Sequence, residues 1–179
     1  MKRIVIILAH PQFQLSHVNK AMIEAASTLD HVTIHDLYEA SPDFHIRVRK
    51  EQKRLLEHDI VVLQYPFQWY STPSLLKEWL DLVLQRGWAY ADGDRALNGK
   101  SLLCAVSTGG HEDSYGKKGY NRHTIETFMS PMAQTAHLCH MNYLPPLFFY
   151  DAHHATPKKI KDHAEQYRKL LIKLGKNKT

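Results

Sequence analysis

Residues 60–74 read IVVLQYPFQWYSTPS, and this stretch decides the fold class. The continuous apolar run at residues 60–63 predicts a strand buried on both faces, as in a parallel sheet. A helix is expected to begin soon afterwards, with Thr72 as its N-cap and Pro73 at its first position. Three aromatic side chains and one amide, at residues 67–70, therefore lie between a strand and a helix. In an open α/β sheet that edge binds ligands, whereas the simpler alternative is an aromatic plug over the core.

The same alternation of strand and helix patterns extends over the whole chain. Strands are predicted at residues 3–9, 31–35, 60–64, 100–107 and 140–150, the last interrupted at Pro145 and Pro146. Helices are predicted at residues 16–29, 47–58, 73–85, about 121–138, and from Pro157 onward with Thr156 as N-cap. The pattern predicts one α/β domain over residues 1–179, with a five-stranded, doubly wound parallel sheet and helices on both faces.

The composition is that of a soluble globular protein, with 44% hydrophobic and 23% charged residues. The sequence has no apolar run long enough for a membrane helix or a signal sequence, so a cytoplasmic location is expected. Of the two cysteines, Cys104 lies in the predicted strand at residues 100–107 and is expected to be a reduced core thiol.

The net charge of +5 comes largely from the last helix and tail, where residues such as Lys176 and Lys178 are expected on a solvated face. No nucleic-acid motif accompanies this charge, so no nucleic-acid partner is expected. A basic surface does favour an anionic cofactor or substrate.

The predicted helix at residues 73–85 is apolar over most of its circumference. A stripe of four residues is widened by three leucines, which gives the apolar set Leu75, Leu76, Trp79, Leu80, Leu82, Val83 and Leu84. A surface helix of this fold class would have a polar outer face. A helix that is covered by the sheet on one side and by a second subunit on the other would have this apolar surface, so we predict a homodimer that uses this helix. The alternative is a helix that is well buried within one chain.

Three segments follow predicted strands at their carboxyl ends, at residues 10–19, 67–70 and 107–110. A strand order of 2-1-3-4-5 brings these segments to one site. The last segment, Ser-Thr-Gly-Gly, offers hydroxyl groups and unhindered backbone N–H groups that can approach the edge of a flat ring. Opposite the aromatic segment, it forms the second side of a slot.

Glycine placement narrows the kind of ligand. All eight glycines occur at position 87 or later, which excludes the dinucleotide and P-loop fingerprints after the first strand. A phosphate is instead expected at the start of the first helix. Ser16 as N-cap, the free N–H groups of Val18 and Asn19, and the imidazole of His10 would hold it.

Residues 10–19, 66–70, 79, 87–90 and 107–110 together resemble the flavodoxin-like NAD(P)H:quinone oxidoreductase family. The chain is most similar to small bacterial members, which include ancillary flavoproteins of glutathione-gated potassium efflux systems and related stress-associated oxidoreductases. The resemblance implies a bound FMN, with FAD as the alternative because larger members hold FAD by the same segments. It assigns the cofactor site to His10, Ser16, His17, Val18, Asn19, Phe67, Gln68, Trp69, Tyr70, Ser107, Thr108, Gly109 and Gly110.

The resemblance also implies a reaction, in which NAD(P)H gives a hydride to flavin N5 and a quinone then accepts it in a ping-pong cycle. Tyr115 matches a tyrosine that assists transfer in the larger quinone reductases, although a mobile loop tyrosine is the alternative. The position of that tyrosine's histidine partner is occupied by Asn121, with His123 two residues further on. The alternative function is a regulatory flavoprotein that docks on a glutathione-gated potassium efflux transporter, at the inner face of the membrane.

The 13 histidines raise the question of a metal site. The adjacent pair at 153–154 and the group His137, Cys139 and His140 give no set of three or four ligands with clear spacing, so no metal is expected. Charged loop residues are candidates for contacting the 2′-phosphate of NADPH, although such charges are commonly solvated: Lys117, Lys118 and Arg122.

Overall fold

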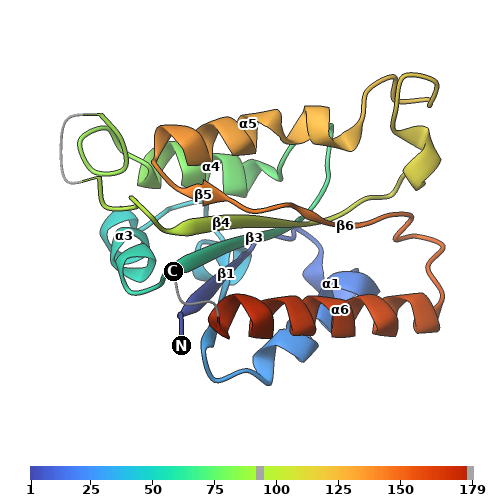
Figure 1. The fold of residues 1–179 in the computed structure, drawn as a ribbon, viewed down its shortest axis with the longest axis horizontal. Helices are drawn as coiled ribbons and strands as arrows, with labels where there is room; N and C mark the ends of the chain where they lie inside the picture. Colours follow the sequence, from blue (N-terminus) through green and yellow to red (C-terminus); the bar gives the residue numbers. More distant parts are fainter. Residues whose placement is uncertain (92–94, 177–179) are drawn as a thin grey trace.

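A parallel sheet forms the middle layer of the computed structural model, which describes residues 1–91 and 95–176 (Figure 1). Its strands are β1 (Ile4–Leu8), β2 (Val32–Asp36), β3 (Ile60–Pro66), β4 (Ser101–Ser107), β5 (Asn142–Tyr143) and β6 (Leu147–Phe149). The strand order is β2-β1-β3-β4-β5, and β6 also pairs with β4. The predicted fold class and strand order are confirmed. Lys178 of the basic tail lies outside the described residues.

The predicted fifth strand forms as two short pieces on the same neighbour. β5 pairs with the start of β4, and β6 pairs with its end, from Ala105↔Leu147 to Ser107↔Phe149. The break falls at the expected Pro145 and Pro146, because proline has no N–H group to donate to a ladder.

Helices cover both faces of the sheet, as expected (Figure 1). The α-helices are α1 (His17–Ser27), α2 (Leu37–Ala40), α3 (Val48–Leu56), α4 (Ser74–Val83), α5 (Ile125–Leu138) and α6 (Pro157–Lys176), and short 3-10 turns lie at Phe13–Leu15 and Glu112–Ser114. Helices α1 and α6 lie on one face, whereas α4 and α5 lie on the other. Within residues 1–91 and 95–176, no helix combines the length and apolar character that a membrane crossing needs.

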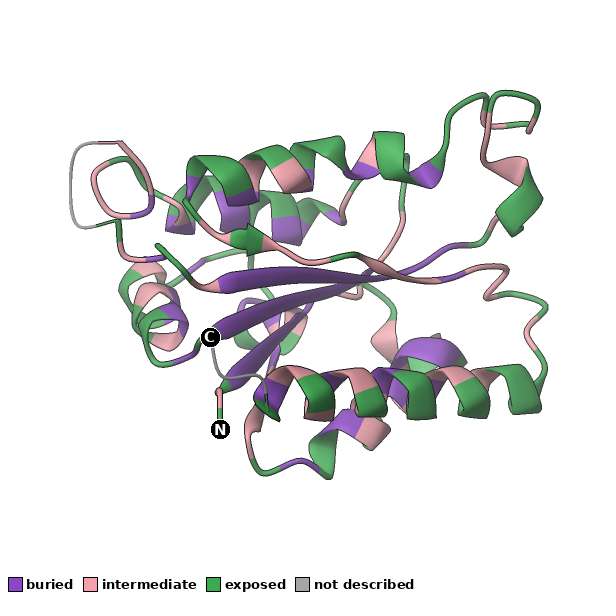
Figure 2. Ribbon diagram, in the orientation of Figure 1, coloured by how far each residue is buried: buried purple, intermediate pink, exposed green. Residues whose placement is uncertain are grey.

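The alternation of side chains in β1 builds two hydrophobic layers from one apolar run. Ile4 and Ile6 join the layer under α1 and α6, whereas Val5 and Ile7 join the layer under α4 and α5. All four are fully buried. Figure 2 shows the buried central strands and the exposed outer sides of the helices. Cys104 is buried and free, as expected for a core thiol, and burial raises its pKa to about 11.

Local capping explains several helix starts. The Ser16 hydroxyl accepts a hydrogen bond from the N–H of Asn19 at 3.2 Å, and Thr156 accepts one from Lys159, so both predicted N-caps are confirmed. The prediction for α4 was one residue early. Pro73 has an extended ψ of 149° and is itself the N-cap, so the helix begins at Ser74 and Thr72 cannot cap it.

Helix α4 is covered by its own chain more fully than its sequence suggests. Five of its apolar residues are buried, and Leu82 is the exposed one, at 37%. Its outer side carries Lys77 and Asp81, which form an ion pair. This is an ordinary amphipathic arrangement. The helix therefore needs no second subunit to account for its apolar residues, and the homodimer stays a prediction.

Candidate functional site

The carboxyl ends of β1, β3 and β4 bring the three predicted segments together. The register aligns Leu8 with Gln64 and Pro66 with Ser107, so the loops that follow these strands lie at one edge of the sheet. Two cavities open there, with volumes of about 440 and 460 Å³, and Phe67 and Gly109 line both. The two cavities therefore adjoin each other, and we refer to them together as the groove. We call the part beside the start of α1 the helix end, and the part beside residues 69–70 the aromatic end.

The structure places all but one of the predicted site residues in this groove. The helix end is lined by the predicted residues His10, Ser16, His17, Val18, Phe67, Gln68, Ser107, Thr108 and Gly109. The aromatic end is lined by Phe67, Trp69, Tyr70, Gly109, Gly110 and Tyr115. The exception is Asn19, which is 1% exposed and lines neither end.

The helix end has the character of an anion site. Helix α1 begins at His17, so the N–H groups of His17 and Val18 have no carbonyl acceptor within the helix and can bind an anion. The N–H of Gln12 donates to His10 Nδ1 at 3.1 Å, so that nitrogen is unprotonated and Nε2–H is the donor. Burial lowers the pKa of His10, which agrees with a neutral ring. No carboxylate is among the described residues that line either end.

Asn19 is buried behind the residues that line the helix end and bonds to two of them, Ser16 and Ser107. Its N–H is occupied by Ser16 Oγ, so the prediction of a free N–H group at this position was wrong. Its side-chain Nδ2 donates to Ser16 Oγ at 3.1 Å and to Ser107 Oγ at 2.9 Å. Its Oδ1 accepts from Gln64 Nε2 at 3.1 Å. One buried amide therefore joins the first helix to β3 and β4.

The aromatic end is built on a tight turn at residues 68–71. Gln68 and Ser71 exchange two backbone hydrogen bonds, of 3.1 and 2.9 Å. The two residues between them, Trp69 and Tyr70, have φ values of 48° and 61°. Asn and Gly are the usual residues in such a two-residue turn, because other side chains are strained at positive φ. The turn presents Trp69 with 94% of its surface exposed, beside the groove rather than over the core.

Tyr115 lies in an aromatic cluster rather than on a free loop. Its ring centroid is 6.3 Å from that of Phe67, 6.5 Å from Phe128 and 5.9 Å from Tyr150. A Cβ atom at Gly110 would lie 3.0 Å from Ser114 Oγ and 3.2 Å from the Tyr115 hydroxyl oxygen, so a larger residue would have to displace these side chains slightly. Burial raises the pKa of Tyr115, although a hydrogen bond with Thr108 acts in the opposite direction. The phenol is therefore protonated at neutral pH and can donate a hydrogen bond.

The structure distinguishes the two candidates for a partner of Tyr115. Asn121 lines the aromatic end, where its Oδ1 accepts a hydrogen bond from Tyr70 and its Nδ2 donates to Ser114. His123 packs its ring edge against Phe128 and lines neither end. The charged loop residues also lie outside the lining and are exposed: Lys117, Lys118 and Arg122.

Several residues that line the groove were not assigned individually to the site by sequence reasoning, although some lie in the predicted segments. They are Gln12, Leu15, Pro66, Ala152 and His153 at the helix end, and His111, Ser114 and Tyr120 at the aromatic end. Ala152 and His153 follow β6, so the rule that sites form at carboxyl ends of strands applies to them as well. The predicted strand at residues 140–150 ended just before them, so the sequence did carry this signal.

The groove fits a planar molecule that carries a phosphate. The helix end supplies N–H, hydroxyl and imidazole donors for an anion, and the aromatic end supplies flat apolar surfaces. The backbone of Gly109 lines both ends, and that of Gly110 lines the aromatic end. FMN has this shape and charge distribution, so the residues present fit it.

Comparisons with known proteins agree with this geometry. A family model described as flavodoxin-like fold matches residues 2–171. The "Glutathione-regulated potassium-efflux system ancillary protein KefG" of Serratia proteamaculans is 43% identical over 92% of this chain and 90% of its own. A general stress protein 14 from Treponema denticola, solved in complex with FMN, is 36% identical, with a TM-score of 0.92 over 96% of this chain and 99% of its own. An NADPH-quinone reductase from P. pentosaceus is 29% identical, with a TM-score of 0.87 and 99% coverage of both chains.

Proposed function

The chain belongs to the family with the flavodoxin-like fold, and from this premise we propose that it is an FMN-dependent NAD(P)H:quinone oxidoreductase. The observation that carries the proposal is the pair of adjoining cavities, with donors suited to an anion at one end and aromatic walls at the other. The solved relative that contains FMN and the relative described as an NADPH-quinone reductase support this choice of cofactor and reaction.

In this proposal, the helix end holds the phosphate of FMN. The N–H groups of His17 and Val18, the Ser16 hydroxyl and His10 Nε2–H are the donors, and the dipole of α1 adds to the attraction. The flat ring lies toward the aromatic end, with Phe67 on one side and the backbone of Gly109 and Gly110 at its edge.

Bound FMN supplies hydride chemistry, so that NAD(P)H, a proton and a quinone give NAD(P)⁺ and the quinol. The chain's own contribution is to position the two substrates in turn at the aromatic end, beside Trp69 and Tyr70. Tyr115, whose phenol keeps its proton, donates a hydrogen bond to the quinone oxygen that gains negative charge. The aromatic cluster around Tyr115 fixes this donor before the substrate arrives.

Turnover by the FMN-loaded protein tests the proposal. NADPH and NADH are each supplied with a benzoquinone, and we expect parallel lines in double-reciprocal plots. Tyr115→Phe removes one hydroxyl, and we expect kcat to fall about tenfold with FMN affinity unchanged, the size of one lost hydrogen bond. Tyr120→Phe is the matched control, because this tyrosine lines the same end but is 89% exposed. Protein that binds no flavin, or FMN-loaded protein without quinone reduction, would contradict the proposal.

FAD is the alternative flavin. The first turn of α1 lines the helix end, and its N–H groups suit a terminal phosphate, which favours FMN. Chromatography of the flavin released from the purified protein distinguishes the two. Release of FAD alone would overturn the choice of FMN and leave the reaction as proposed.

A second candidate function is supported by the KefG relatives, which are described as ancillary to a potassium-efflux system. In this alternative the chain is a regulatory flavoprotein that docks on a glutathione-gated potassium efflux transporter, in the cytoplasm at the inner face of the membrane. A deletion strain complemented with Tyr115→Phe separates the functions. Full restoration of regulated efflux by this slow variant supports docking, whereas restoration in proportion to turnover supports the enzyme.

We also retain the homodimer as a proposal, on a different surface from the one that the sequence suggested. Trp69 and Tyr120 are 94% and 89% exposed at the mouth of the aromatic end, where a second subunit would cover them. Light scattering of the FMN-loaded protein measures its mass. A monomer at micromolar concentration would contradict the dimer without affecting the proposed reaction.

A further inference from the structure

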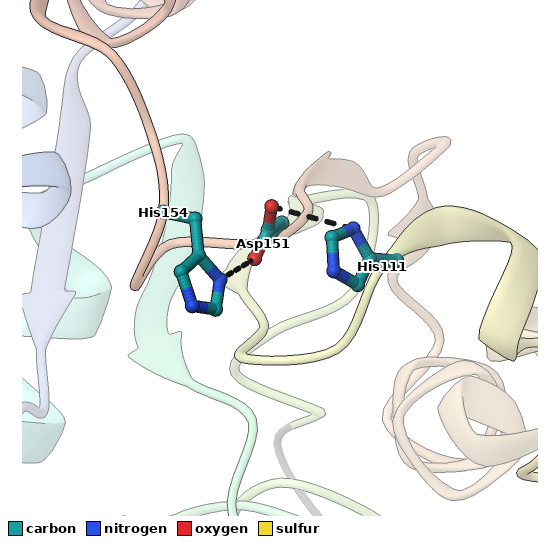
Figure 3. A group of neighbouring side chains, drawn as sticks. All are labelled: His111, Asp151 and His154. Atoms are coloured by element: carbon teal, nitrogen blue, oxygen red, sulfur yellow. Dashed lines mark hydrogen bonds and ion pairs between the residues drawn. The ribbon is translucent and has the colours of Figure 1, made fainter.

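Three side chains from two loops converge beside the groove, outside the residues assigned to FMN. His111 follows the Gly-Gly turn after β4, whereas Asp151 and His154 follow β6 (Figure 3). His154 Nδ1 lies 2.7 Å from Asp151 Oδ1, and His111 Nδ1 lies 3.3 Å from Asp151 Oδ2. One ligand atom from each residue lies within 4.8 Å of the other two. The aspartate is thus flanked by an imidazole at each oxygen.

The backbone fixes the two loops against each other. The N–H of Asp151 donates to the carbonyl of Gly110 at 3.0 Å, and the N–H of Ala152 donates to that of Thr108 at 2.9 Å. Asp151 itself has a φ of 59°, a conformation that aspartate tolerates better than most residues. The two imidazole rings are nearly parallel, 5° apart, with centroids separated by 6.1 Å. The carboxylate therefore has a set position, while both histidines can still adjust their rings.

Two imidazole nitrogens and one carboxylate oxygen form a ligand set that divalent transition metals prefer. Ligand atoms bound tetrahedrally to zinc are roughly 3.3 Å apart, given bond lengths near 2.0–2.1 Å. His111 Nδ1 lies at this distance from Asp151 Oδ2, whereas His154 Nδ1 lies 2.7 Å from the other oxygen, Oδ1. An ion bound by one carboxylate oxygen therefore needs one histidine to shift toward that oxygen, which the exposed His154 side chain can do.

The surroundings leave room and charge for a cation. His111 and Asp151 line a cavity of about 610 Å³ between the 111–114 loop and α6. Among the described residues that line it, carboxylates outnumber ammonium groups. The carboxylates belong to Glu112, Asp113, Asp151 and Asp162, and the ammonium groups to Lys158 and Lys159. Lys158 pairs with Asp162 at 2.7 Å, and Lys159 donates to the carbonyl of Tyr150, so both ammonium groups are already engaged. Water in the cavity can complete the coordination of a three-residue site.

We propose that His111, Asp151 and His154 bind a divalent transition-metal ion of the zinc type. The sequence alone favours no metal, because the adjacent pair at 153–154 gives no set of three or four ligands with clear spacing. The ion links the loop after β4 to the loop after β6, and its ligand His111 is the residue that follows Gly110 in the chain. The site does not depend on the flavin and can be tested on the protein without it.

Metal titration of untagged, flavin-free protein tests this proposal. We expect one equivalent of Co²⁺ to give visible d–d absorption, and Zn²⁺ to displace it, with calorimetry giving the Zn²⁺ affinity. His111→Ala, His154→Ala and Asp151→Asn should each weaken Zn²⁺ binding more than tenfold, because each removes one of three ligands. His153→Ala is the matched control, since it removes an exposed neighbouring histidine outside the cluster.

The three variants and the control should have the same circular dichroism spectrum as the parent protein, because the histidines are exposed and Asp151→Asn keeps the side-chain shape. Zinc affinity that is unchanged in His111→Ala and His154→Ala would overturn the proposal. A parent protein that binds no Zn²⁺ would overturn it too, and the cluster would then be only an ion-pair bridge between the loops. Loss of binding in His153→Ala alone would likewise contradict it.

Discussion

Asn19 is a buried amide on which three parts of the groove depend. It bonds to the helix cap Ser16, to Ser107 at the end of β4 and to Gln64 in β3. Gln64 is completely buried, so its amide has no access to water as a substitute partner. The proposed phosphate donors are therefore held in place by a residue that does not itself line the cavity.

Replacement of Asn19 tests this supporting role. Asn19→Ala should lower the free energy of unfolding by about 1–3 kcal/mol, because the buried Ser107 hydroxyl loses its donor and Gln64 Nε2 keeps only the backbone carbonyl of residue 19, at 3.3 Å. FMN affinity should fall as well, although no contact with the phosphate is removed. Urea denaturation and flavin titration measure the two effects. Gln14→Ala is an exposed control that should change neither, and an Asn19→Ala protein as stable as that control would refute the network.

Trp69 has an unfavourable backbone conformation in an exposed turn. Asparagine tolerates its φ of 48° better than tryptophan does. Trp69→Asn should therefore raise the free energy of unfolding by about 1 kcal/mol while lowering the rate of quinone reduction. Trp69→Ala loses the same ring but keeps the backbone strain, so its rate of quinone reduction should fall while its free energy of unfolding does not rise. Equal stability of the Asn and Ala variants would show that the turn stores no strain.

A buried charge joins α3, α4 and β2 on the face of the sheet away from α1. Glu51 of α3 accepts a hydrogen bond from the Trp79 indole at 2.9 Å, and its carboxylate lies 3.0 Å from His35 Nε2. Burial acts to raise the pKa of Glu51, but the contacts with His35 and Trp79 outweigh it, so the pKa lies below the usual 4.5. The packing of these three elements therefore depends on an ionised carboxylate.

This arrangement predicts a pH dependence of stability. A carboxyl group with a lowered pKa in the folded state stabilises the fold fully above its unfolded value of 4.5, and that contribution is lost as the pH falls through the folded value. Glu51→Gln should thus be less stable than the parent by about 1–3 kcal/mol at neutral pH, with a smaller difference in acid. Denaturant unfolding from neutral pH down to about pH 3 measures this. A difference that stays constant over the range would exclude the ionised carboxylate as its source.

The elements that sequence reasoning located are those with strong local signals. Residues 60–66 are apolar with little interruption, and Ser16 and Thr156 cap helices by contacts within three residues. Helix α2 had such a signal that was missed, since Asp36 stands three residues before Glu39 and accepts from its N–H. The sequence carried no signal for the positive φ angles of Trp69 and Tyr70, because neither residue type is typical of such turns. The bridging role of Asn19 and the cluster of His111, Asp151 and His154 could not be predicted either, because the residues that interact are distant in the chain.

At the level of the whole molecule, flavin binding should stabilise the fold. Comparing flavins with and without a phosphate shows which end of the groove supplies the binding energy. FMN at a hundred times its Kd should add about 2.7 kcal/mol to the free energy of unfolding. Riboflavin has the same ring but no phosphate, so the same concentration should add much less if the helix end holds the phosphate. Thermal melting with each ligand, at low and high salt, provides the measurement. Equal shifts for the two ligands would place the binding energy at the aromatic end alone.

The divided strand at β5 and β6 has a consequence for how the molecule behaves in a crowded solution. These two pieces form an outer border of the sheet, where unpaired backbone groups can recruit a strand from another molecule. Pro145 and Pro146 interrupt that border and bring no N–H donors, so an approaching strand finds no continuous ladder to extend. The same two residues that shorten the fifth strand thereby protect the sheet against edge-to-edge aggregation.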